Sequence, residues 1–212
     1  NVSDEQRSNL LAYPLQNYFE NAGAVDMPIC IGINVNQTVE IAFEGIKRIK
    51  QLSNGRPFWI EYGNELYAIS AEEIVANVDE YVAKLRRLNR LVKEYDPSIK
   101  IGVPLLALSS DRAIKNDPNN WVRSEDDWEY TQGSRALEWN TTLAQNPDCY
   151  DAIVVHYYSG IHNFTDIKPK DVLRMHLSDV LLQGFSTEAM LKRQYPGKEF
   201  WATEYGVLSY NV

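Results

Sequence analysis

The sequence is poor in cysteine, in clustered cationic residues and in long apolar runs, and each scarcity excludes a class of protein. Two cysteines among 212 residues, Cys30 and Cys149, cannot form a disulfide framework, and we expect both to be buried free thiols. No stretch reaches the roughly 18 apolar residues that a membrane span needs. The formal net charge is -8, with Lys and Arg scattered, so neither nucleic acid nor an anionic membrane is an expected partner.

Several motifs of catalysis and cofactor binding are also missing from the sequence. No Gly-rich phosphate loop follows any apolar run, which disfavours nucleotide binding. No Gly-x-Ser-x-Gly motif is present, so a serine nucleophile has no support. No His, Cys and Asp cluster has the spacing of metal ligands along the chain. We therefore expect neither a catalytic metal nor a cofactor.

The sequence does contain an alternation of short apolar runs with longer amphipathic segments. Such a rhythm is typical of βαβ units with a parallel sheet. The expected strands are residues 29–35, 58–62, 99–106, 153–158 and 200–204. The expected helices are residues 9–21, a segment from Val39, a helix after the capping box Ser70-Ala71-Glu72-Glu73 that ends at Asp96-Pro97, and a region over 169–194. A long polar stretch separates Ser109 from about Arg135.

This order fits two architectures, an open doubly wound sheet or part of a (β/α)8 barrel. In a barrel, catalytic groups lie at the C-terminal ends of the strands. Three expected strands end in chemically capable residues: Asn64-Glu65, His156-Tyr157-Tyr158 and Glu204. This pattern favours a partial (β/α)8 (TIM) barrel of the α/β class, with residues 1–212 forming a single partial catalytic domain.

Two of these residues, Glu65 and Glu204, are the carboxylates that glycosidic bond cleavage requires. Cleavage with retention needs one carboxylic acid to protonate the leaving oxygen and a second carboxylate, about 5 Å away, to attack the sugar. Because the two residues follow different strands, they can face each other across the top of a barrel. Strand alternation also places Glu61 on the inner face beneath Glu65, where we expect it to have a supporting role.

The motifs around these residues resemble clan A glycoside hydrolases, above all the arabinofuranosidase-like and xylosidase-like members. The clan has an Asn-Glu pair at the end of strand 4, a His-x-Tyr feature on strand 6 and a Glu at the end of strand 7. The matching segments are Trp59-Ile60-Glu61-Tyr62-Gly63-Asn64-Glu65, His156-Tyr157-Tyr158 and Trp201-Ala202-Thr203-Glu204-Tyr205-Gly206. The resemblance extends from the helix before strand 3 to the end of strand 7.

The resemblance implies a role for each matched residue. Glu65 is the implied acid/base and Glu204 the implied nucleophile. Asn64 is expected to contact the sugar hydroxyl next to the anomeric carbon, and Asn34 to face the pocket from the end of strand 3. Tyr158 is expected to hydrogen-bond Glu204. His156 either lines the site or is a satisfied core histidine.

Strands 1, 2 and 8 of a complete barrel have no counterpart here, and a complete barrel needs about 250 residues. We therefore expect strands 3 to 7 of an internal fragment. The expected function is retaining hydrolysis of O-glycosidic bonds in an oligosaccharide or polysaccharide. The alternative is a catalytically silent carbohydrate-binding barrel. We expect an extracellular or periplasmic location, and the sequence gives no indication of the oligomeric state.

The tryptophans near the long polar stretch have two interpretations. Trp121, Trp128 and Trp139 could stack on sugar rings in substrate subsites. Tryptophan is more often part of the core or of a packed lid, so core packing is the competing interpretation for each.

Overall fold

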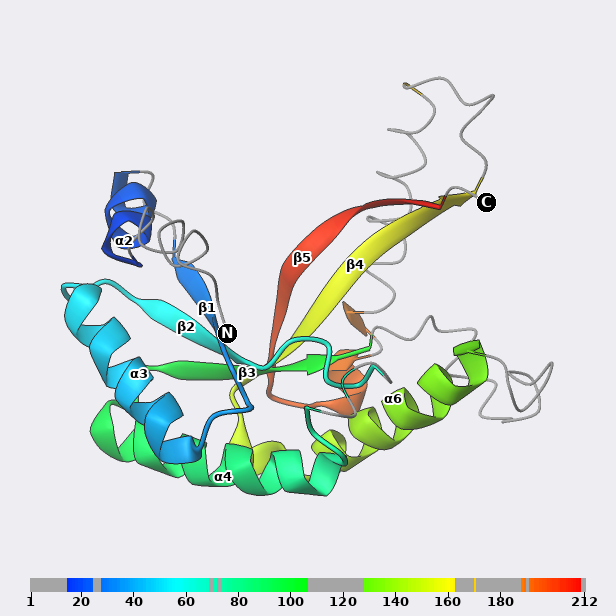
Figure 1. Ribbon diagram of the computed structural model, residues 1–212, viewed down its shortest axis with the longest axis horizontal. Coiled ribbons are helices and arrows are strands. Elements are labelled where there is room, and N and C mark those ends of the chain that lie inside the picture. Colours follow the sequence, from blue (N-terminus) through cyan, green and yellow to red (C-terminus); the bar gives the residue numbers. More distant parts are fainter. Residues whose placement is uncertain are drawn as a thin grey trace, which may run out of the picture.

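A computed structural model of the chain describes residues 15–24, 28–68, 71, 74–106, 128–162, 170, 188–189 and 191–210. Within these residues, five strands form one parallel sheet in the order β1-β2-β3-β4-β5 (Figure 1). The strands are β1 (Ile29–Ile33), β2 (Phe58–Tyr62), β3 (Lys100–Leu105), β4 (Ala152–His162) and β5 (Glu199–Tyr210). Each strand pairs with the next strand in the chain, as in a (β/α)8 barrel. The prediction of a partial barrel is confirmed.

The helices cover one face of this curled sheet. They are α2 (Leu15–Ala24), α3 (Val39–Leu52), α4 (Val78–Tyr95) and α6 (Trp128–Gln145), followed by the short 3-10 helix η3 (Pro147–Cys149). In Figure 1, α3, α4 and α6 lie along the same side of the sheet. The helix-covered face therefore corresponds to the outside of a barrel, and the opposite face to its interior.

Alternation along the strands divides their side chains between these two faces. Ile60, Ile101, Val103 and Val155 pack under the helices in the main hydrophobic core. On the interior face, the rings of Trp59 and Trp201 stack with centroids 5.0 Å apart and planes 15° apart, beside Ala152 and Val154. Gly102 makes room for this stack, because a Cβ there would lie 2.6 Å from the Trp201 ring.

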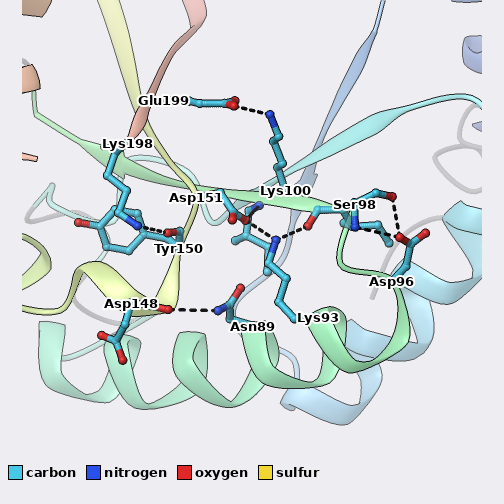
Figure 2. Close-up of polar contacts among 12 residues, drawn as sticks. Asn89, Lys93, Asp96, Ser98, Lys100, Asp148, Tyr150, Asp151, Lys198 and Glu199 are labelled. Carbon is cyan, nitrogen blue, oxygen red and sulfur yellow. Dashed lines mark hydrogen bonds and ion pairs between the residues drawn. The ribbon is translucent and has the colours of Figure 1, made fainter. Parts of the chain in front are cut away.

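Polar contacts join the N-terminal ends of the strands, at the end opposite to the expected site (Figure 2). Lys93 Nζ donates to the Ile99 carbonyl at 2.7 Å and to Asp151 Oδ2 at 2.8 Å. The same Asp151 oxygen accepts from the backbone N–H of Ile101 at 2.8 Å. Lys100 on β3 also pairs with Glu199 on β5. These contacts fix the N-terminal ends of the strands relative to α4. The candidate site residues lie at the other, C-terminal ends of the strands.

The start of α4 differs from the sequence prediction. The helix begins at Val78 with Asn77 as its N-cap, and the Asn77 side chain accepts from the backbone N–H of Glu80 at 2.9 Å. The capping-box residues from Ser70 to Glu73 precede this helix in the sequence. Of these four residues the structure describes only Ala71, which lies in a 3-10 turn. Asn77 caps the helix at a position closer to the uninterrupted apolar stripe than the capping box does. The prediction that the helix starts directly after the capping box was therefore wrong. The predicted end at Asp96-Pro97 is confirmed.

Three other predictions need correction. The last part of the expected polar stretch is helical, because α6 begins at Trp128. The expected strand ends were too early for β4 and β5 and too late for β1 and β3. Cys149 is a buried free thiol, but Cys30 is exposed, because it lies on the interior face of the edge strand β1. Residues 9–14 and most of the region 169–194 lie outside the described residues.

Within the described ranges, β1 pairs only with β2, and β5 pairs only with β4. The two ends of the sheet are therefore edges rather than a closed seam. Among the helices that the structure describes, none combines the length and apolar character that crossing a membrane requires.

Candidate active site

The candidate site lies at the C-terminal ends of the strands, where residues from four of the five come together. Asn34 follows β1 and Glu65 follows β2, while His156 and Glu204 belong to β4 and β5. Asn34 and Asn64 are both exposed and line the same cavity as Glu204. Asn34 Oδ1 accepts from the backbone N–H of Asn36 at 2.9 Å, which fixes the turn after β1.

Glu65 is held in place by an unusual backbone path. Gly63 has φ +88°, and its N–H donates to the Ile33 carbonyl at 3.0 Å, which extends the contact between β1 and β2 past the end of the strand. Glu65 itself has φ +44°, a left-handed conformation that is uncommon for a residue with a side chain. Strain of this kind concentrates at functional sites, and here it turns the carboxylate toward β4.

Glu204 faces the interior because β5 contains a bulge. Ala202 pairs with Val155, but the next residue of β4, His156, pairs with Glu204, so Thr203 is the additional residue. Regular alternation from the inward-facing Trp201 would have turned Glu204 outward. The bulge instead places Glu204 beside His156.

His156 contacts three glutamates. Its Nδ1 lies 3.1 Å from Glu65 Oε1 and 3.5 Å from Glu204 Oε2, and its Nε2 lies 3.3 Å from Glu61 Oε1. The side chains of His156 and Glu61 are only 3% and 10% exposed, whereas those of Glu65 and Glu204 are 41% and 42% exposed. The site thus has a buried His–Glu pair beneath two accessible carboxylates, and the inward position expected for Glu61 is confirmed.

The charge of His156 follows from this environment. Burial alone lowers the pKa of His156, but hydrogen bonds to Glu61 and Glu65 and the charges of Glu204 and Glu61 outweigh it and raise the pKa to about 8. At neutral pH the ring is therefore mostly an imidazolium that donates from both nitrogens. Tyr67 donates its hydroxyl to Glu65 Oε1 at 3.4 Å, and burial, with the nearby Glu65, keeps the pKa of this hydroxyl well above its ordinary value.

A cavity of about 860 Å³ opens beside these groups. Its walls come from β1, β2 and β5, and they include Glu61 and Glu204 together with Trp59 and Trp201. A space of this size falls within the range of small-molecule sites, and its walls combine aromatic and polar groups.

Glu65, His156 and Glu204 are close enough to share a cation. One ligand atom from each of Glu65, His156 and Glu204 lies within 4.8 Å of the other two. The sequence identified these three residues as site residues but not as possible metal ligands, because they come from three different elements and lack the short spacing of a metal motif. A cation bound there would require His156 to be unprotonated at the nitrogen that binds it.

The fold and the arrangement of the site define part of a (β/α)8 barrel with two carboxylates at its C-terminal end. Solved structures of α-L-arabinofuranosidases share this fold, with TM-scores of 0.51 for the GH51 enzyme of Thermotoga petrophila, 0.56 for the enzyme of Thermotoga maritima and 0.56 for the family 51 enzyme of Bifidobacterium longum. The sequence identities are 20%, 20% and 12%. No model of a known protein family matches the chain, and neither does any curated protein sequence.

These alignments cover 91–92% of this chain but only 37–38% of each enzyme. The chain therefore spans less than two fifths of the length of the structures that it resembles. At these identities the likeness shows the fold, and at that level the resemblance to glycoside hydrolases of this clan is confirmed.

The structure brings most of the predicted residues together. His156 contacts both Glu65 and Glu204, and Asn34 and Asn64 lie at the adjacent cavity. Tyr158 pairs with Gly206 through its backbone, but its side chain lies outside the described part, so its hydrogen bond to Glu204 stays a prediction.

Two residues that contact this region were missed, Tyr67 and Arg135. Tyr67 lies only two residues after Glu65, and that proximity was the one signal available. Trp139 is 1% exposed and packs against Tyr81, which supports the core interpretation; Trp121 and the side chain of Trp128 lie outside the described residues.

Proposed function

We propose that this chain carries the catalytic carboxylates of a retaining glycoside hydrolase. The observation that carries the proposal is the proximity of Glu65 and Glu204, since one carboxylate oxygen of each lies within 4.8 Å of the other at the C-terminal end of the sheet. Retaining enzymes hold their carboxyl groups about 5 Å apart, whereas inverting enzymes leave room for a water molecule between them. The shared contact with His156 supports a catalytic pair over two unrelated surface carboxylates.

In this proposal Glu204 is the nucleophile. Its carboxylate attacks the anomeric carbon, and the glycosidic C–O bond breaks as Glu65 donates its proton to the leaving oxygen. The product of this step is a covalent glycosyl ester on Glu204. Glu65, now ionised, then takes a proton from water, which attacks the same carbon and releases the sugar with its original configuration.

His156 helps to assign the two roles. Its Nδ1 carries one hydrogen, which lies within reach of both Glu65 and Glu204. When Glu65 is protonated, this hydrogen is donated to Glu204 and stabilises the ionised nucleophile. After Glu65 has given up its proton, the imidazolium stabilises the Glu65 carboxylate instead. Glu61 holds the other ring nitrogen, so the ring keeps its orientation between the two states.

The other residues bind the sugar in this proposal. The amide of Asn64 contacts the hydroxyl next to the anomeric carbon, Asn34 lines the pocket, and Tyr158 hydrogen-bonds Glu204. The expected substrate is an oligosaccharide or polysaccharide, and L-arabinofuranosides are the first to test, because the related structures are arabinofuranosidases. We further propose that the protein acts outside the cytoplasm, without a metal or other cofactor.

The test is hydrolysis of a panel of aryl glycosides by the complete protein, with the configuration of the first product determined by proton NMR. We expect retention, and a 2-fluoro glycoside should label Glu204, as located by peptide mass spectrometry. Glu204→Gln should abolish both the turnover and the label. Inverted product would contradict the mechanism, binding without turnover would identify a carbohydrate-binding barrel, and loss of activity in a chelator would indicate metal-dependent chemistry.

A further inference from the structure

The loop that follows the proposed acid/base is held by a single arginine of α6. Arg135 Nη2 donates to the Leu66 carbonyl at 3.0 Å and to the Val75 carbonyl at 2.8 Å. Its Nη1 donates to the Ala76 carbonyl at 3.1 Å, and its Nε to the Leu66 carbonyl at 3.3 Å. One guanidinium therefore connects both ends of the loop that joins Glu65 to α4.

The first of these carbonyls belongs to the residue immediately after Glu65. Glu65 is in a left-handed conformation with φ +44°, which contacts around it must stabilise; its carbonyl accepts from the backbone N–H of Ala68 at 2.8 Å within the loop, and Arg135 adds a contact from outside it. The Leu66 side chain is 2% exposed, so the core holds this residue from one side while Arg135 holds its carbonyl from the other. A shift of the Leu66 carbonyl would rotate the Glu65 carboxylate away from His156.

A stack of aromatic rings holds the arginine in turn. The guanidinium of Arg135 lies 5.4 Å from the ring centroid of Trp139, which packs against Tyr81 with centroids 4.9 Å apart. Tyr81 stacks on Tyr62 at 5.5 Å and donates its hydroxyl to the Tyr62 carbonyl at 2.8 Å, at the last residue of β2. The stack thus connects the end of β2 to the arginine that holds the loop after it.

We propose that Arg135 is a positioning residue that sets the orientation of Glu65 through the Leu66 carbonyl. The proposal rests on the proposed function of Glu65 as the acid/base. Arginine suits this role because its planar fork presents five N–H donors in fixed directions, whereas lysine offers a single mobile ammonium group. An acid that is misplaced by about 1 Å loses much of its effect, so the arginine affects proton donation without touching the substrate.

The test compares substrates that differ only in the acidity of the leaving group, in the complete protein. Arg135→Met should lower kcat/KM at least tenfold for an aryl glycoside with a poor leaving group, and less than threefold for a dinitrophenyl glycoside, which departs without a proton. Arg135→Lys should show the same selectivity to a smaller degree. Arg86→Met is the matched control, because Arg86 contacts Asn146 and Asp148 on an exposed surface of the protein, and it should change neither value.

Glu65→Ala separates the two hypotheses. If Glu65→Ala shows no selectivity between leaving groups, the assignment of Glu65 as acid/base fails, whatever Arg135 does. If Glu65→Ala is selective but neither Arg135 variant is, or both substrates lose equally, the positioning role is overturned. In the Glu65→Ala background, Arg135→Lys should cause no further loss. Should Arg135→Met not fold, Trp139→Phe, which weakens the ring contact of the guanidinium, must show the same direction of selectivity.

Discussion

His156 is surrounded by three carboxylates, and this arrangement gives the site its pH dependence. A cation with one buried and two accessible anionic neighbours is stabilised in the folded protein more than in the unfolded chain. The buried Glu61 is the partner that water screens least, since its side chain is only 10% exposed. The charge of His156 therefore contributes to stability as well as to the proposed chemistry.

We predict that the protein is less stable at pH 8.5 than at pH 6. The folded pKa of His156, about 8, lies above its ordinary value of 6.5. The stabilisation is therefore complete below pH 6.5 and is lost as the pH rises through 8, to a total of about 2 kcal/mol. Urea unfolding at both pH values should detect the difference, and His156→Asn should flatten it. An equal pH dependence in the variant would show that other groups are responsible.

Replacement of Glu65 by Ala should affect substrates according to their leaving groups. Without a proton donor, hydrolysis of a glycoside with a poor leaving group should slow by about 10²–10⁴-fold, the range of general acid catalysis. A dinitrophenyl glycoside needs no proton to depart, and its first step should be nearly unchanged. The kcat/KM values for both substrates measure this contrast, because kcat/KM reports the first step and not the later attack of water, and equal losses would contradict the role of Glu65.

At the level of elements, the turn after β2 is the most sensitive part of the site. Gly63 has φ +88°, and a Cβ there would lie 2.4 Å from Leu66 Cδ1 and 3.1 Å from Val35 Cγ1. Any other residue at this position would be strained by the positive φ and would force the Leu66 side chain to move.

We predict that Gly63→Ala lowers the free energy of unfolding by about 1–3 kcal/mol, through backbone strain and the clash with Leu66. Gly45→Ala is the control. Gly45 lies within α3 and has no atom near its Cβ position, so alanine there should stabilise the protein by about 0.5–1 kcal/mol. Urea unfolding of both variants compares the same chemical change at two sites. A Gly63→Ala protein as stable as the unmodified one would show that this turn adapts easily.

The elements were predictable where a single local pattern decided them. The run over 58–62 became β2 with the predicted bounds, because a continuous apolar segment in a parallel sheet is buried on both faces. The start of α4 was not predictable, because two capping signals competed and the sequence does not indicate which one the sheet geometry favours. Helix α6 was missed because its first turns are polar and lack a clear apolar stripe.

The site was predictable in its residues but not in its geometry. Motifs at the strand ends identified Glu65, His156 and Glu204, since parallel strands bring their C-terminal ends together. The bulge at Thr203 could not be inferred, although the inward position of Glu204 depends on it. The contacts of Arg135 were equally hidden, because they join α6 to backbone carbonyls about 60–70 residues earlier, and any residue type can supply a carbonyl.

At the scale of the whole molecule, the sheet curls but does not close in the described part of the chain. In the described part of the chain, β1 and β5 are the first and last strands of the sheet, and each pairs on one side only. The side chains of Ile29, Ile31 and Ile33 are only partly buried against the core, as expected for an edge strand. The cavity beside Glu204 lies between these two edge strands and is bounded by residues of both.

The final prediction concerns the 212-residue polypeptide expressed by itself. Among the described residues, no strand pairs with the outer edge of β1 or β5, and sheet edges with free N–H and C=O groups beside apolar side chains favour aggregation or marginal stability. Glu204 lies on one of these edge strands and is 42% exposed, so water should weaken the electrostatic contribution on which the proposed mechanism depends. We expect low or undetectable hydrolysis of aryl glycosides, and a broad thermal transition with oligomers in light scattering.

A longer polypeptide that supplies further strands at both edges should be monomeric and at least 100-fold more active. A monomeric, cooperatively unfolding and fully active 212-residue protein would show that five strands suffice, and that the open edges impose no cost on the site.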